Sequence, residues 1–114
     1  MRKTNKKIIG ELFPTLRWAL AQNVEFEKKD YYGKLYKEVQ KDSFPVRWTR
    51  VGDGATLVKV TMPLRGKYDH ATVAATVYSD GKTEFSYSKE FTGKGNGYYA
   101  LLNENEKIIK GEWD

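Results

Sequence analysis

Two short turns constrain the register of the second half of the chain more than any other feature. Residues 52–54 and 79–81 each contain an Asp-Gly pair between runs of alternating apolar and polar side chains, which is typical of β-hairpins. At the first turn, a two-residue loop would place Trp48 opposite Lys59, whereas a three-residue loop places it opposite Val58. Register decides which side chains share a face, and only the three-residue loop gathers the apolar ones. We therefore predict a three-residue loop with glycine in the left-handed conformation.

The second hairpin gives the same answer. With residues 79–81 as its loop, the apolar side chains again fall on one face, and the other face carries Thr, Ser and Glu, which suits contact with water. The two registers together predict one shared buried face, which consists of Trp48, Val58, Val60, Val73, Ala75 and Phe85.

The N-terminal segment carries a helical stripe. One helix face is marked by apolar residues that recur every three or four positions: Ile9, Leu12, Leu16, Leu20 and Val24. Pro14 interrupts this stripe, and a proline in a helix interior removes a hydrogen bond and clashes with the preceding turn. We therefore expect a helix from about Pro14 to Asn23, preceded by a kink or a short first turn.

A second helix is predicted over residues 30–43. Tyr31, Leu35 and Val39 are spaced four apart, and Asp30 suits the N-cap position. The helix should end by Ser43, because the proline at position 45 pushes the residue before it out of the α region. The opposite side of such a helix would gather Lys34, Lys37 and Lys41.

These elements predict an α+β fold with two N-terminal helices on one face of a four- to six-stranded antiparallel meander. The 114 residues suit a single domain, 1–114, in which residues 1–7 form a flexible basic arm. A last pair of strands is expected over 97–102 and 107–113, although the segment 103–114 also fits a short helix. The apolar stretch at 8–10 is too short for a secretion signal, so we expect a cytoplasmic protein.

Catalysis and metal binding are not expected. The chain has no cysteine and one histidine, His70, whose neighbour Asp69 would point to the opposite face of a strand. Glu84 and Glu90 would lie about 20 Å apart in an extended strand, too far for an acid–base pair. The Gly-rich segment 92–97 lacks the Gly-Lys-Ser/Thr ending of a phosphate loop. We therefore predict a protein that is not an enzyme and needs no cofactor.

The charge distribution indicates a polyanionic partner. Residues 1–50 carry 12 basic and 6 acidic side chains, whereas residues 51–114 carry 8 and 9. In the predicted register Arg47 lies opposite Lys59, and like charges in that position are destabilising unless a bound anion neutralises them. We predict a basic, non-enzymatic protein that binds nucleic acid, or a complex containing it. The expected phosphate contacts are Arg47, Arg50, Lys59, Arg65, Lys67, Lys34, Lys37 and Lys41.

The sequence leaves other functions open. A phage- or plasmid-type accessory protein could act as an inhibitor of a host enzyme that processes nucleic acid, with aromatic side chains at the interface. The expected partner-binding residues are Trp18, Tyr68 and Lys94 of the Gly-rich segment. A ligand cavity under a curved sheet is a third possibility. The sequence does not distinguish DNA from RNA or single from double strands, and it does not identify a protein partner or an oligomeric state.

Overall fold

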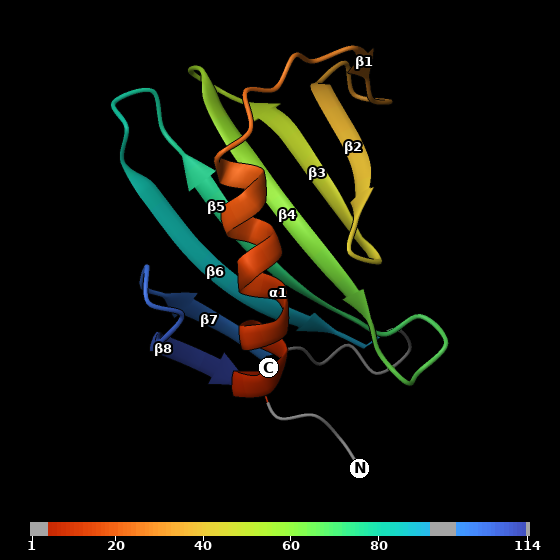
Figure 1. Cartoon of the computed structure of the whole chain (residues 1–114), viewed down its shortest axis with the longest axis vertical. Helices are drawn as coiled ribbons and strands as arrows, with labels where there is room; N and C mark the ends of the chain where they lie inside the picture. Colours follow the sequence, from red (N-terminus) through yellow and green to blue (C-terminus); the bar gives the residue numbers. More distant parts are fainter. Residues whose placement is uncertain (1–4, 92–97, 114) are drawn as a thin grey trace.

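A wide antiparallel sheet dominates the computed structural model, which describes residues 5–91 and 98–113 (Figure 1). Over these residues the chain forms one helix and eight strands, each paired with the next in chain order. The elements are α1 (Asn5–Leu20), β1 (Lys28–Lys29), β2 (Leu35–Lys41), β3 (Phe44–Val51), β4 (Ala55–Pro63), β5 (His70–Val77), β6 (Thr83–Glu90), β7 (Tyr98–Leu102) and β8 (Ile108–Trp113). The fold is therefore mostly sheet, and the predicted arrangement of two helices on four to six strands is wrong.

The segment 30–43, predicted to be the second helix, is a turn followed by β2. The Asp30 carboxylate accepts hydrogen bonds from the backbone amides of Tyr32 and Lys34, both at 2.9 Å, and Gly33 has a φ of 80°. Aspartate at the first and glycine at the fourth position are turn preferences, which the sequence analysis interpreted as a helix N-cap. A left-handed backbone at position 33 ends any helix there.

The spacing that suggested this helix fits a strand equally well. Leu35 and Val39 are four residues apart, an even number, so they also lie on one side of a strand. The strand ends at a two-residue turn in which Asp42 and Ser43 have φ values of 52° and 71°. Two left-handed residues match the twist of a tight hairpin, and they bring β3 back beside β2.

Helix α1 is longer than predicted, because it begins at Asn5 and continues through Pro14 to Leu20. Pro14 and Gly10, whose carbonyl the proline leaves without an amide partner, both lie on the exposed side of the helix. The predicted stripe is largely confirmed: Ile9, Leu12 and Leu16 are buried. Residues 5–7 of the expected flexible arm belong to the first turns of α1, and the rest of the arm lies outside the described residues.

The core lies between α1 and the middle of the sheet. Both hairpin registers are confirmed, with three-residue loops that pair Trp48 with Val58 and Ala75 with Phe85. The six residues of the predicted buried face all belong to the core, Phe85 as a partly buried member. The indole Nε1 of Trp48 donates to the carbonyl oxygen of Ala19 at 3.1 Å, which ties β3 to the end of α1.

The last segment of the chain forms strands β7 and β8, which resolves the choice between strand and helix. Asn103 closes their connection as Asp30 closes its own turn, since its side-chain oxygen accepts from the amides of Asn105 and Lys107. Within the described residues no helix combines the length and apolar character that a membrane crossing requires.

Two glycine substitutions compare the turn at residues 30–34 with a true helix. Gly33 lies in the turn that replaces the predicted helix, and Gly10 lies inside α1 as the helical reference. Gly33→Ala should lower the free energy of unfolding by about 1–2 kcal/mol, because alanine is strained at a φ of 80°. Gly10→Ala lies in the exposed interior of α1, where an added Cβ would meet nothing within 4 Å beyond the adjacent backbone of the helix, and it should raise this free energy by about 0.5–1 kcal/mol. Urea denaturation measures both. A stabilising Gly33→Ala would mean that residues 30–43 are helical after all.

Candidate functional site

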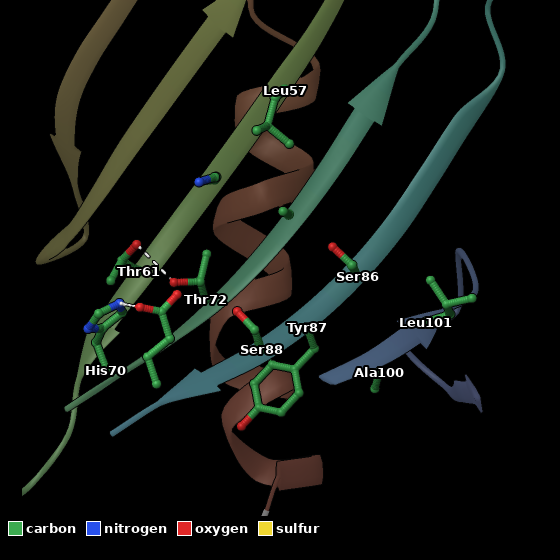
Figure 2. Close-up of a pocket in the computed structure, with 12 residues that line it drawn as sticks. Leu57, Thr61, His70, Thr72, Ser86, Tyr87, Ser88, Ala100 and Leu101 are labelled. Atoms are coloured by element: carbon green, nitrogen blue, oxygen red, sulfur yellow. Dashed lines mark hydrogen bonds and ion pairs between the residues drawn. The ribbon is translucent and has the colours of Figure 1, made fainter. Parts of the chain in front are cut away.

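The sheet has one covered and one open face. α1 packs on the covered face, and the other face, here called the open face, carries no helix in the described part of the chain (Figure 2). Strand pairing aligns one row of side chains across the open face: Glu38, Arg47, Lys59, Ala74, Ser86 and Leu101. The predicted opposition of Arg47 and Lys59 is therefore present.

The negative charge that compensates Arg47 is a carboxylate of the protein itself. The Arg47 Nε lies 3.7 Å from a carboxylate oxygen of Glu38, and the guanidinium lies over the Tyr36 ring, 4.2 Å from its centroid. Both partners are on β2, a segment that the sequence analysis had predicted as a helix packed on the sheet rather than as one of its strands. An internal carboxylate and an aromatic ring explain how the like charges are tolerated, so this pair is not by itself evidence of an external anion.

Lys59 lies in a shallow groove of about 610 Å³ on the open face. Hydroxyl side chains from three strands line it, and the Thr61 and Thr72 oxygens are 3.3 Å apart (Figure 2). Leu57 and Leu101 add apolar surface. The groove lies on the face away from α1, and the ligand cavity under a curved sheet that the sequence left possible stays a prediction.

His70 has a partner that the sequence analysis missed. Its Nε2 lies 3.1 Å from a carboxylate oxygen of Glu90, and its Nδ1 lies 3.3 Å from the Tyr68 carbonyl oxygen. The confirmed register of β5 and β6 pairs His70 with Glu90, so the hairpin pattern contained this signal. Both ring nitrogens therefore have an oxygen partner within 3.3 Å. Among the described residues, no group of three or more acidic or histidine side chains could hold a metal ion.

Acidic side chains also lie on the open face. The Tyr78 hydroxyl donates to the Glu84 carboxylate at 3.3 Å, and the negative charge of Glu84 raises the pKa of that hydroxyl above its ordinary value. Glu38, Glu84 and Glu90 are thus interspersed with Arg47 and Lys59. The open face has mixed charge, which does not favour a polyanion along its length.

The positive charge is concentrated at one side of the sheet. Strands β1 to β3 and their turns, residues 28–51, carry seven basic and three acidic side chains, or four of the five net positive charges. We call this segment the basic edge. It contains five of the eight predicted contacts, Lys34, Lys37, Lys41, Arg47 and Arg50, and two lysines that were not predicted, Lys28 and Lys29.

The predicted cations do not share one face. Lys37 and Lys41 pair with residues on the helix side of β3, whereas Lys34 lies in the turn before β2, so the helical stripe is wrong. The Arg50 Nη1 donates to the Gly54 carbonyl at 2.7 Å. Beyond the basic edge lie Lys59 in the groove and Arg65 and Lys67 in the loop before β5.

Two tyrosines project from the basic edge. Tyr31 and Tyr32 occupy the turn between β1 and β2 and are 95% and 83% exposed. Their rings meet edge to face, with centroids 5.4 Å apart. The sequence pattern placed Tyr31 on the apolar stripe of a helix, so its exposure beside Tyr32 is a finding of the structure. We call residues 30–34 the tyrosine turn.

The predicted partner-binding residues lie apart from each other. Trp18 is partly buried, with its ring centroid 6.2 Å from that of Trp48 and the Lys41 ammonium over it. Tyr68 is 60% exposed in the loop before β5, beside Lys67. Lys94 lies outside the described residues.

Comparison with protein-family models, curated proteins and solved structures finds no match. The function is therefore argued from the geometry above.

The environment of Arg47 predicts opposite outcomes for two charge-neutralising variants. Arg47→Gln should lower the free energy of unfolding by about 1 kcal/mol, because Glu38 and Tyr36 both lose their cation. Lys59→Gln should leave it unchanged or raise it by a few tenths of a kcal/mol, because it removes only a like charge. Urea denaturation measures the free energy of unfolding of both variants. Equal effects would show that Glu38 does not compensate Arg47.

Proposed function

We propose that the protein binds nucleic acid without sequence preference, through phosphate contacts at the basic edge. The observation that carries the proposal is the grouping of four of the five net charges on β1 to β3. Lysine and arginine side chains that neutralise phosphates release counterions, which gives affinity without selecting a sequence.

Four of the five lysines of the basic edge are available for such contacts, and the fifth, Lys41, pairs with Asp42. Within the described residues, Lys28, Lys29, Lys34 and Lys37 make no ion pair. The acidic side chains of the segment are engaged internally: Asp30 accepts the amides of its turn, and Glu38 faces Arg47. Because β1 is a two-residue strand at the border of the sheet, a ligand can approach its lysines from either face.

Inhibition of an enzyme that processes nucleic acid is the second candidate. Exposed apolar side chains near the opposite border of the sheet support it, since Leu101, Ile108 and Ile109 are 51%, 42% and 66% exposed. Such side chains at an edge strand suit a protein interface. This candidate predicts weak or no binding of free nucleic acid at ordinary salt.

The salt dependence of binding tests the proposal. Lys28→Gln/Lys29→Gln should weaken binding to a labelled oligonucleotide and should flatten the log–log salt slope by roughly 1.4 for a single strand or 1.8 for a duplex. Fluorescence anisotropy between about 0.05 and 0.2 M salt measures this slope.

The matched control removes the same charge elsewhere. Lys82→Gln/Lys107→Gln changes two exposed lysines in distant turns, and its slope should equal that of the unaltered protein. Equal flattening by both pairs would show that net charge, rather than the basic edge, determines binding. No binding to any nucleic acid at low salt would refute the proposal and favour the inhibitor.

A further inference from the structure

We infer that the tyrosine turn is a base-stacking platform, so that the preferred ligand is single-stranded nucleic acid. The inference rests on the proposed function and deepens it. It starts from Tyr31 and Tyr32, the two most exposed of the large hydrophobic side chains in the described residues. An aromatic ring stabilises a fold through the area that it removes from water, and these two rings remove almost none.

The turn holds its rings on an ordered backbone. The Asp30 amide donates to the Lys34 carbonyl at 2.9 Å, and the Gly33 amide donates to the Asp30 carbonyl at 3.0 Å. The Asp30 carboxylate accepts two further amides from inside the turn. Four hydrogen bonds over five residues fix the backbone, so ligand binding needs to order only the side chains.

Charge complementarity selects nucleic acid as the ligand of these rings. Lys28 and Lys29 precede the turn, and Lys34 closes it, so three lysines flank the two tyrosines within seven residues. Proteins that bind single strands combine cations along the backbone with aromatic rings on which bases stack. An acidic protein partner with an apolar surface could also use the lysines. Binding to such a partner would not, however, make this protein prefer single-stranded over double-stranded nucleic acid.

The position of the rings favours a single strand over a duplex. A duplex buries the faces of its bases in its own stack and offers a protein only base edges and phosphates. An unpaired base can stack on an exposed ring while its phosphate reaches a neighbouring lysine. The lysines therefore serve both strand forms, whereas the tyrosines serve only the single strand.

Removing both rings tests the inference. Tyr31→Ala/Tyr32→Ala should weaken binding to an unlabelled oligothymidylate of about 16 nucleotides by tenfold or more, since each stacked base contributes about 1–3 kcal/mol. Affinity for a duplex of the same length should change less than about twofold, and the salt slope should stay the same because no cation is removed. Competition against a labelled oligonucleotide measures all three quantities.

Two further variants separate stacking from other causes. Tyr31→Phe/Tyr32→Phe should restore single-strand affinity, because the ring and not the hydroxyl stacks. Tyr78→Ala removes a partly exposed tyrosine beside the acidic Glu84 and should change neither affinity. Because the tyrosine turn contributes little buried area, the midpoint of thermal unfolding should be the same in every tyrosine-turn variant.

The outcomes for this inference and for the proposed function are distinct. Equal losses on single strand and duplex, or an unchanged single-strand affinity in Tyr31→Ala/Tyr32→Ala, would overturn the stacking platform and leave phosphate binding intact. Tighter binding of duplex than of single strand by the unaltered protein would also overturn it. Failure of the unaltered protein to bind either form at low salt would instead refute the proposed function.

Discussion

The contact between Trp48 and the end of α1 determines which face of the sheet is covered. The indole is buried against the helix, and its Nε1 donates to the Ala19 carbonyl in the last turn of α1, which also accepts the Gln22 amide. This contact requires the hairpin register that pairs Trp48 with Val58. A shift by one residue would turn Arg47 toward the helix and expose the indole, so the charges of the open face depend on the same register.

One helix cannot cover eight strands. α1 packs mainly on β3, β4 and β5, and its Arg17 reaches the turn between β7 and β8, where it donates to the Glu104 carbonyl oxygen. The border formed by β1 lies beyond the strands on which the helix mainly packs. Exposed sheet edges invite pairing with other chains, and lysines on a short edge strand prevent this. Lys28 and Lys29 therefore have a structural role as well as the proposed one. Tyr31 and Tyr32 do not protect the edge in this way, because exposed rings beside an edge promote association with other chains. The two tyrosines are therefore the stronger argument for a ligand.

Sequence reasoning succeeded where turn chemistry and side-chain alternation agreed. The loops at 52–54 and 79–81 gave both registers, and extending the second one leads to the contact of His70 with Glu90. It failed over 30–43, where a spacing of four fits a helix and a strand alike, and where Asp30 suits both an N-cap and a turn. The glycine three residues later decides for the turn, because its left-handed backbone ends a helix.

That one error determined most of what was wrong about the site. With 30–43 as a helix, Glu38 had no place beside Arg47, so the opposed cations implied an external anion that the structure supplies internally. The same assignment buried Tyr31 and hid an exposed aromatic pair among three lysines. With β2 as a strand of the sheet, the net positive charge lies at the border formed by β1 to β3 rather than across the open face. There Lys28, Lys29 and Lys34 make no ion pair within the described residues, and the two tyrosine rings beside them contribute little to the stability of the fold.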